Sequence, residues 1–442
     1  VFERVLHTYD ALNNVVDENL QGIRVVKSYN RESFEVGKFG RISQRIFKDF
    51  TKAERIMSFN SPLMMICIYG SMILIAWMGA QQIVASGNNP AVGLTTGDLT
   101  ALVTYAMQIL MAMMMLSMIF IMVIISQASA ERICQVLQEE STVQNPAQPV
   151  TDMADGSIEF DHVTFRYSDS SEKPVLDDIN LKIRSGMTVG IVGGTGSAKS
   201  SLVQLVPRLY DVTSGSLKVG GVDVRDYDLK ALRDKIGYVP QQSVLFKGTV
   251  ASNVSYGDDV NGASSADVEM ADTSTPAGRK REAELIAAGK RVEGAAMPAE
   301  QMNRVKAAAG VAQATEFVER MDGTYTAPIA QGGSNVSGGQ KQRLSIARAV
   351  YRHPEILIFD DSFSALDFKT DREVRDALAK EAKGSTKLIV AQRIGTIMNV
   401  DRIIVLDDGK VVGQGTHEEL LDTCEVYRQI AESQLSEDEL KR

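Results

Sequence analysis

Hydrophobic residues in the first part of the chain follow two patterns. Between residues 8 and 50, Leu12, Val15, Val16, Leu20 and Ile23 recur at helical spacing, which predicts an amphipathic helical stretch with a break near residues 28–32. Two later segments, 56–97 and 99–130, contain no Asp, Glu, Lys or Arg. Because about 20 apolar residues cross the hydrocarbon core of a bilayer, these segments predict membrane spans at about 58–85 and 99–126.

The alternative, two buried helices of a large soluble protein, explains less well why two such runs are joined by a short polar loop at residues 87–98. In lipid, backbone polar groups must pair within the helix. Five Lys or Arg residues lie between 41 and 55 and Arg132 follows the second run, whereas the loop carries only Asp98. Basic residues favour the cytoplasmic side, so we expect both ends of the hairpin in the cytoplasm and the loop outside.

The remainder of the chain has the pattern of a soluble domain. A linker with Pro and Gln at residues 142–151 is followed by short apolar runs typical of strands, with helical patterns between several of them. The predicted strands are 157–165, 188–192, 216–219, 236–239, 356–359, 387–391 and 402–406. This alternation predicts an α/β domain with a parallel core sheet. We therefore expect an all-α transmembrane segment at 1–140, a linker at 141–155 and an α/β domain at 156–442.

Composition narrows the classes of function. The net charge of −9 argues against general affinity for nucleic acids. The three cysteines form no CxxC pair, which fits a reducing compartment without a disulfide framework or a zinc site. The chain begins at Val1 within a helical pattern, and we interpret it as the C-terminal piece of a longer polypeptide.

The strongest chemical motif follows the predicted strand 188–192. It consists of Gly193, Gly194, Thr195, Gly196, Ser197, Ala198, Lys199 and Ser200. A glycine-rich loop between a strand and a helix can direct backbone N–H groups at phosphate oxygens. Lys199 would reach the β- and γ-phosphates, and Ser200 would place its hydroxyl on Mg²⁺. Ala198 stands where the pattern has glycine, and we expect it to adopt the dihedral angles of a helix start.

A second apolar strand, 356–359, ends in Asp360. A carboxylate in this position is the usual companion of a phosphate loop and would hold Mg²⁺, in part through water. An aspartate after an apolar strand is by itself more often only the end of that strand. The phosphate loop upstream favours the functional interpretation.

These motifs and several others, in the same order, resemble the ATPase domain of ABC transporters. Residues 335–340 (Asn-Val-Ser-Gly-Gly-Gln) are similar to the family signature, 364–367 to the D-loop and 331–334 to the X-loop of exporters. Gln241 is similar to the Q-loop glutamine, and Tyr167 lies where the family stacks an aromatic ring on adenine. The first 140 residues resemble the last third of the exporter membrane domain, in which 28–32 would form a coupling helix. Exporter subunits have six spans, so four would be missing.

The resemblance implies ATP and Mg²⁺ as cofactors, bound between two ATPase domains that face each other head to tail. Residues of this chain that would contact ATP are Tyr167, the phosphate loop 193–200, Ser201 and the signature residues Ser337, Gly338, Gly339 and Gln340. The signature would serve the nucleotide held by the partner domain. Residues that would hold the metal are Ser200, Gln241 and Asp360.

Two residues depart from the family pattern. Asp361 stands where the family has a glutamate that polarises the attacking water, and Gln392 replaces the switch histidine; with Gln241 they are the expected catalytic residues. Aspartate is shorter by one C–C bond, about 1.5 Å, and glutamine cannot become cationic. Together they predict slow hydrolysis in one half of a heterodimeric exporter whose partner supplies the glutamate and the histidine. A slow homodimeric exporter and a regulatory nucleotide sensor are the alternatives.

Residues 257–316 contain no Phe, Tyr or Trp, and 258–303 is predicted to be a surface insertion longer than the family needs. A soluble ABC ATPase that acts on nucleic acids is disfavoured by the membrane hairpin and the acidic balance. We expect a multi-pass membrane protein with a cytoplasmic ATPase domain. Its partners would be a second half-transporter, the lipid bilayer and a small-molecule or lipid cargo, with drug, lipid and peptide export left open.

Overall fold

The computed structural model describes residues 2–168, 170–256 and 297–435 of the chain. These residues form two compact units, 1–140 and 141–442, which are considered separately. The first unit is entirely helical, and the second contains both sheets and helices.

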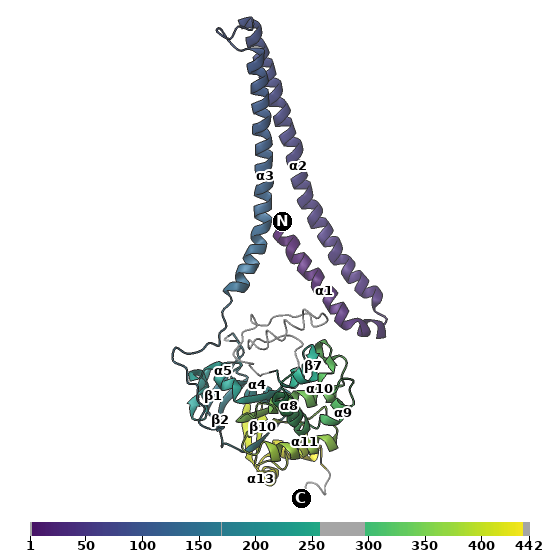
Figure 1. Ribbon diagram of the computed structural model, residues 1–442, viewed down its shortest axis with the longest axis vertical. Coiled ribbons are helices and arrows are strands. Elements are labelled where there is room, and N and C mark those ends of the chain that lie inside the picture. The colour runs from purple at the N-terminus through teal and green to yellow at the C-terminus, as the bar shows by residue number, and fades with distance from the viewer. Residues whose placement is uncertain (1, 169, 257–296, 436–442) are drawn as a thin grey trace. The chain divides into compact units, whose positions relative to one another are not determined.

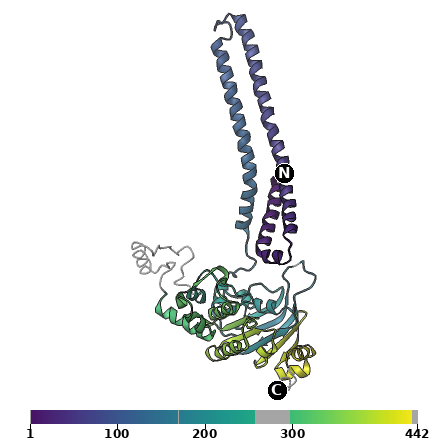
Figure 2. The ribbon, with the colours of Figure 1, turned by 90° about the vertical axis from the view of Figure 1, so that its right-hand side faces the viewer.

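The first unit consists of three helices, α1 (Phe2–Ser28), α2 (Glu32–Ser86) and α3 (Thr96–Gln138). Helix α1 lies along the first part of α2, and α2 and α3 run side by side as a long hairpin (Figures 1 and 2). The segments Pro62–Ser86 and Thr96–Phe120 are long and apolar enough to cross a membrane, and in their most apolar 18-residue stretches only 11% and 0% of the residues are buried. Helices of a soluble core would be mostly buried, so both predicted spans fit lipid better than a protein interior.

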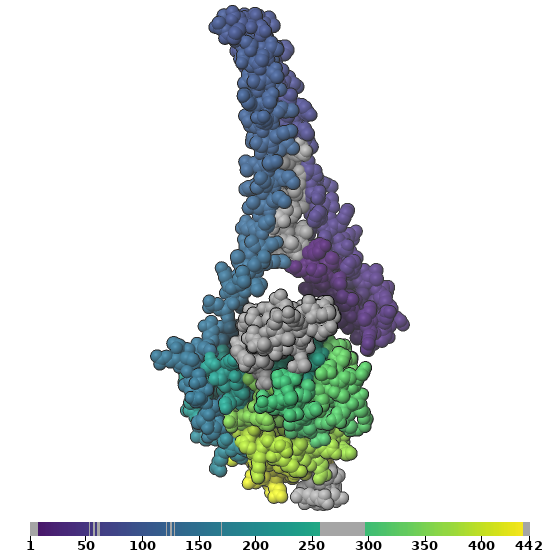
Figure 3. All heavy atoms as spheres, viewed as in Figure 1, coloured from purple at the N-terminus to yellow at the C-terminus, as the bar shows by residue number. Residues whose placement is uncertain are grey.

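Many apolar side chains of the hairpin, whose atoms Figure 3 draws as spheres, are exposed. Trp77 is 67% exposed and Met115 is 68% exposed. Surfaces of this kind are costly in water but are the normal outer surface of a membrane-spanning helix. Pro62 lies inside α2 without ending it, which membrane helices tolerate more readily than soluble ones.

The segment that the family resemblance makes a coupling helix, 28–32, is a turn and not a helix of its own. Ser28 ends α1 and Glu32 begins α2, so only three residues separate the two helices. Asn30 takes a left-handed conformation with φ of 51°, and the Arg31 N–H donates to the Val26 carbonyl at 2.9 Å. Three residues are fewer than one helical turn of 3.6 residues, which is why the break is a tight reversal.

The second unit is built on a six-stranded sheet with the order β12-β11-β3-β10-β9-β6. The five strands from β11 to β6 are parallel, and β12 is antiparallel to β11. The strands of this sheet are β3 (Thr188–Gly193), β6 (Ile236–Val239), β9 (Ile356–Asp360), β10 (Thr386–Val390), β11 (Arg402–Asp407) and β12 (Lys410–Gly415). The predicted parallel core sheet is therefore present.

Two of the predicted strands, 157–165 and 216–219, do not belong to that core. They are β1 (Ile158–Phe165) and β4 (Ser214–Val219), and they lie in a separate antiparallel sheet of order β2-β1-β4-β5 with β2 (Leu176–Ile183) and β5 (Val222–Asp223). Alternating burial along β1 and β2, with one face in the core, is typical of such a sheet. A third, two-stranded sheet pairs β7 (Gly248–Thr249) with β8 (Pro328–Ile329).

Helices complete the second unit (Figure 1). Those between β3 and β8 are α4 (Lys199–Leu205), η1 (Val224–Asp226), α5 (Leu229–Asp234), α6 (Val250–Val254), α8 (Ala299–Val311), α9 (Thr315–Glu319) and η3 (Thr324–Thr326). Those that follow are η4 (Gln331–Gly333), α10 (Gly338–Val350), α11 (Phe368–Glu381), α12 (Ile394–Ile397), α13 (His417–Thr423) and α14 (Glu425–Glu432).

Burial of the central strands explains how the site is positioned. All residues of β9 and β10 are buried, as expected for strands of a parallel sheet that is covered on both faces. In a parallel sheet the carboxyl ends of the strands share one edge, and ligands bind there. The ends of β3, β9 and β10 bring Gly193, Asp360 and the residues after Val390 to this edge.

The predicted insertion, 258–303, lies outside the described residues up to position 296. Its last positions, 299–303, form the start of α8, which begins at Ala299. The helix is anchored by Val305 and Ala309, which are fully buried. An alanine-rich composition suits a packed helix as well as a solvated loop, and the bounds of the insertion stay a prediction.

Candidate nucleotide-binding site

The phosphate loop connects β3 to α4, in the strand–loop–helix context that the sequence predicts. A side chain at Gly193 would bring a Cβ atom to 2.1 Å from the Leu406 carbonyl oxygen, so only glycine fits there. Gly196 has φ of 85°, a conformation that glycine adopts at low cost. Gly194, Thr195 and Gly196 are exposed, which leaves their backbone N–H groups open to a phosphate.

Ala198 does not adopt the helical dihedral angles expected from the sequence. Its φ of 68° and ψ of 24° are left-handed, which costs an alanine roughly 1–2 kcal/mol. The backbone has a positive φ directly before Lys199. Glycine adopts positive φ at low cost, which explains why the pattern has glycine here. The structure thus accommodates the methyl group in a strained conformation rather than in the first turn of α4.

The Lys199 ammonium lies within the curl of this loop. Nζ donates to the carbonyl oxygens of Gly193 at 3.0 Å and Gly194 at 2.8 Å, and to the hydroxyl of Ser197 at 3.3 Å. Burial lowers the pKa of Lys199, and the carboxylates of Asp361 and Asp360 oppose that shift. The cation is therefore held where the loop would present it to phosphate oxygens.

Ser200 and Asp360 meet as the sequence predicts, although they are 160 positions apart. The Ser200 hydroxyl donates to Asp360 Oδ1 at 2.8 Å. Asp360 is only 2% exposed. The other oxygen of its carboxylate, Oδ2, accepts a hydrogen bond from the Tyr238 hydroxyl at 3.1 Å.

Asp361 brings the three predicted catalytic residues together. Its Oδ2 accepts hydrogen bonds from Gln392 Nε2 at 2.8 Å and from Gln241 Nε2 at 3.3 Å. Burial raises the pKa of the Asp361 carboxyl, while its hydrogen bond with Gln241 lowers it. Among the hydrogen bonds of the described residues, Gln241 contacts Asp361 and neither Asp360 nor Ser200. The structure thus relates it to the catalytic position more directly than to the predicted metal position.

Tyr167 lies beside the first helix after the loop, as an adenine-stacking residue would. Its hydroxyl is 2.8 Å from the Ser201 hydroxyl, and its ring contacts Phe165 and Tyr210 edge to face at 4.8 and 5.1 Å between ring centroids. The side chain is still 52% exposed. An aromatic ring that is fixed by neighbours and open to solvent can receive a flat ligand.

The signature residues form the start of α10. Ser337 is the N-cap, and it exchanges hydrogen bonds with Gln340, whose Oε1 accepts from the Ser337 N–H at 2.8 Å. Ser337 and Gly338 are exposed, and no other atom lies within 4 Å of the position that a Cβ would take at Gly338. Exposed N–H groups at the start of a 13-residue helix attract anions. The hydrogen bonds that the structure gives Ser337 and Gln340 stay within this turn.

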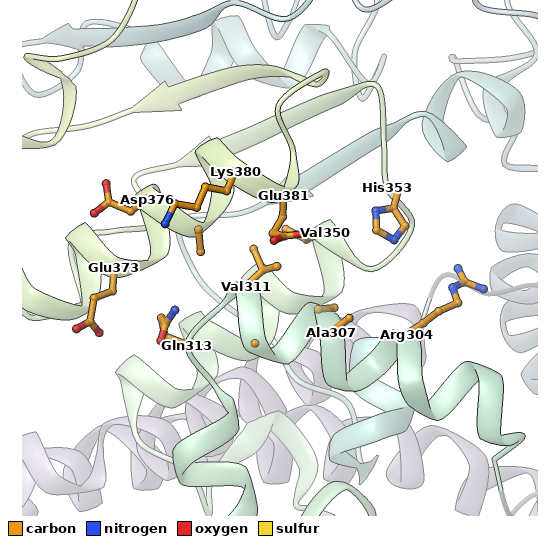
Figure 4. Close-up of a pocket in the computed structure, with 13 residues that line it drawn as sticks. Arg304, Ala307, Val311, Gln313, Val350, His353, Glu373, Asp376, Lys380 and Glu381 are labelled. Carbon is orange, nitrogen blue, oxygen red and sulfur yellow. The ribbon is translucent and has the colours of Figure 1, made fainter.

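A cavity of about 660 Å³ lies elsewhere in the second unit (Figure 4). It is lined by α8, α11 and the end of α10, with Arg304, His353, Asp376 and Glu381 among its charged or polar residues. None of the residues predicted to bind ATP lines it. The candidate nucleotide site is instead an open edge of the sheet.

The residues at this edge fit ATP with Mg²⁺. Mg²⁺ prefers oxygen ligands and is usually held by one or two protein groups together with substrate phosphates. Ser200 and Asp360 supply a hydroxyl and a buried carboxylate at 2.8 Å from each other, and Lys199 supplies the cation for the phosphates.

Sequence reasoning missed Tyr238. Position 238 lies in none of the motifs of the sequence, yet Tyr238 is the second hydrogen-bond donor to the buried Asp360. Burial, followed by the Asp360 charge, raises its pKa, whereas a hydrogen bond with Gln204 lowers it. The alternation of β6 offers a signal, because a polar hydroxyl in an otherwise apolar strand needs a partner.

Comparisons with known proteins identify the family of both units. The ABC transporter family profile matches residues 176–364, and the ABC transporter transmembrane region profile matches residues 1–113. An uncharacterized ABC transporter ATP-binding protein of Mycobacterium tuberculosis is 38% identical over 436 residues, which cover 98% of this chain and 67% of the relative. An ATP-dependent lipid A-core flippase of Saccharophagus degradans is 31% identical over 445 residues, covering 98% and 66%.

A solved structure extends the likeness to the fold of the whole chain. The structure of a bacterial Atm1-family ABC exporter with ATP bound superimposes with a TM-score of 0.78 at 26% sequence identity. The match covers 98% of this chain and 70% of that structure, so the chain spans about two thirds of the length of these relatives. The family profiles match both the membrane region and the ATPase domain, and the relatives match along 98% of the chain. The chain therefore belongs to the ABC transporter family, and to its exporter type with membrane and ATPase domains in one polypeptide.

Proposed function

We propose that this chain is the degenerate-site half of a heterodimeric ABC exporter, which binds ATP tightly but hydrolyses it slowly. The observation that carries this proposal is the double hydrogen bond to Asp361, in which the amides of Gln392 and Gln241 both occupy Oδ2. A general base must come within reach of the attacking water. Asp361 is shorter than glutamate by one C–C bond, and its two amide partners hold Oδ2 at the edge of the sheet.

Binding is assigned to the intact part of the site. Lys199 and the loop N–H groups would hold the β- and γ-phosphates, Ser200 and Asp360 would hold Mg²⁺, and Tyr167 would stack on the base. Mg²⁺, when bound, neutralises charge on the phosphates. With Ala198 in its left-handed conformation, Lys199 still donates to the Gly193 and Gly194 carbonyls, which supports binding at this site.

Hydrolysis is limited by the two substitutions. Gln392 donates an amide N–H to Asp361 at 2.8 Å, whereas a histidine could also carry positive charge toward the developing phosphate charge. The signature, in contrast, keeps Ser337, Gly338 and Gly339 at an exposed helix start. We propose that it completes the competent site of a partner that carries the glutamate and the histidine.

We propose lipids or other amphiphilic small molecules as the exported class. The lipid A-core flippase relative supports this class, and the hairpin presents many flexible Met side chains that adapt to varied apolar surfaces. Drug-like and peptide cargo belong to the same proposal as alternatives, because the described helices include only two of the membrane spans.

The asymmetry is tested by comparing Lys199→Ala in this chain with the matching lysine change in the partner, in the reconstituted pair. We expect a modest loss of ATPase activity from the change here and a nearly complete loss from the change in the partner. Equal, nearly complete losses from both would contradict the proposal. So would rapid hydrolysis by this chain alone, which would favour the homodimeric exporter.

A regulatory nucleotide sensor is the second candidate, because Asp361 and Gln392 both favour binding over turnover. ATP-stimulated movement of a labelled lipid by the reconstituted pair distinguishes the two. A sensor would change a partner's activity on binding ATP but would move no lipid itself.

A further inference from the structure

The carboxylate of Asp360 is fixed at both of its oxygens. Oδ1 accepts from the Ser200 hydroxyl at 2.8 Å, and Oδ2 accepts from the Tyr238 hydroxyl at 3.1 Å. Asp360 is 2% exposed, so water has little access to compete for either oxygen. A buried carboxylate depends on such donors for its stability and orientation.

The register of the sheet explains why Tyr238 can reach this carboxylate. Tyr238 on β6 pairs with Ile358 on the parallel strand β9. Side chains alternate along a strand, so Ile358 and Asp360 point to the same face as Tyr238. Asp360 is then the diagonal neighbour, a distance that an aromatic side chain spans. A shorter hydroxyl residue at position 238 would not reach it.

Tyr238 is also tied to the helix that follows the phosphate loop. The Tyr238 ring packs against the buried cluster that includes Leu202 and Leu205 of α4. The phenol is therefore held by its ring and by the hydrogen bond of its hydroxyl to Asp360. Its direction toward Asp360 is set by the fold and not by the nucleotide.

We propose that Tyr238 is a positioning residue for the Mg²⁺ site, whose hydroxyl holds Asp360 Oδ2 so that Oδ1 faces Ser200 and the metal. The inference rests on the proposed MgATP site at Ser200 and Asp360. Without this hydroxyl, the carboxylate gains rotational freedom, and Oδ2 is left buried without its donor. The affinity for ATP with Mg²⁺ then falls, while the affinity for ATP without metal is unchanged, since Tyr238 contacts no predicted phosphate ligand.

The experiment compares ATP affinity with and without metal in the full chain in lipid nanodiscs. Binding of a fluorescent ATP analogue is titrated once in excess Mg²⁺ and once in EDTA, and the ratio of the two dissociation constants is the readout. In Tyr238→Phe, which removes the hydroxyl and keeps the ring, we expect the ratio to fall about tenfold, the scale of one hydrogen bond to a charged group. Affinity in EDTA should stay as in the unchanged protein.

Tyr227→Phe is the matched control. The Tyr227 hydroxyl is also buried, and it donates to the Val219 carbonyl at 2.9 Å, away from Asp360. This variant loses a buried hydrogen bond of similar kind, so it reports any general effect of destabilisation. The Mg²⁺ ratio of Tyr227→Phe should equal that of the unchanged protein, and thermal unfolding of both variants shows that they are folded.

Ser200→Ala separates failure of this inference from failure of the proposed site. If Ser200→Ala abolishes the Mg²⁺ ratio and Tyr238→Phe leaves it unchanged, the role of Tyr238 is refuted while the site stands. If Ser200→Ala has no effect either, the metal site itself is wrongly assigned. A Tyr238→Phe variant that weakens binding equally in Mg²⁺ and in EDTA has lost structure rather than metal positioning, and this outcome also overturns the inference.

Discussion

If this site hydrolyses ATP slowly, as we propose, replacing Asp361 with glutamate should make it faster. The Asp361 N–H donates to the Val390 carbonyl at 3.1 Å, so the backbone stays in place and the added methylene moves the carboxylate forward by about 1.5 Å. The two amides on Oδ2, at 2.8 and 3.3 Å, come from exposed glutamine side chains that can yield. The longer side chain therefore has a path toward the γ-phosphate.

The size of the effect follows from that displacement. A misplacement of about 1 Å costs roughly 100-fold in rate, which corresponds to about 2.7 kcal/mol of activation free energy. We expect Asp361→Glu to raise kcat by about 10- to 100-fold. Adding Gln392→His should raise it further, because histidine can bring positive charge to the phosphate.

The assay is phosphate release by the reconstituted pair in nanodiscs, with the matching lysine of the partner changed to Ala, at saturating ATP and Mg²⁺. Asp361→Asn is the control for the carboxylate, and Lys199→Ala in the Asp361→Glu background is the control for the site, since it should return the rate to background. ATP affinity is measured for each variant. The reasoning is refuted if Asp361→Glu binds ATP as before and hydrolyses it no faster.

Three further outcomes test other parts of the structure. Ala198→Gly should stabilise the second unit by about 0.5–1 kcal/mol, because relief of roughly 1–2 kcal/mol of left-handed strain exceeds the added unfolded-state entropy; a lower melting temperature would contradict this. His417 is buried, with Nδ1 2.7 Å from the Tyr427 hydroxyl, and burial lowers its pKa. As the pH falls, the unfolded state therefore takes up a proton first, so the free energy of unfolding should decrease below about pH 6.5. Denaturant titration at several pH values should show a weaker decrease for His417→Gln. A membrane-impermeant maleimide should label Asn89→Cys on intact cells and Cys134 only after permeabilisation; the reverse pattern would invert the predicted orientation.

Local patterns carried much of the prediction. The two charge-free runs became helices whose apolar windows, Pro62–Ser86 and Thr96–Phe120, are long enough to span a bilayer. The strand before Gly193 and the strand that ends in Asp360 are present as expected. Each of these features depends on neighbouring residues, because hydropathy and strand–loop–helix order are contiguous properties.

The errors arose where backbone conformation or packing overrides residue type. Ala198 adopts a left-handed conformation that alanine normally avoids, and the segment 28–32 is a turn with Asn30 at φ of 51°. Residues 299–303, at the end of the predicted insertion, are helical because buried Val305 anchors α8. In each case the surrounding fold decides the local geometry.

The amino-acid sequence alone determined that this chain has a membrane hairpin, an ABC-type ATPase domain and a site with two unusual residues. Only the tertiary structure decided which side chains meet there. Asp360 contacts Ser200, 160 positions away, and Tyr238, 122 positions away, because the register of β6 on β9 sets which side chains share a face. The strength of a hydrogen bond changes when its length changes by a few tenths of an ångström. Remote segments are held at the required distance only after the strands have paired.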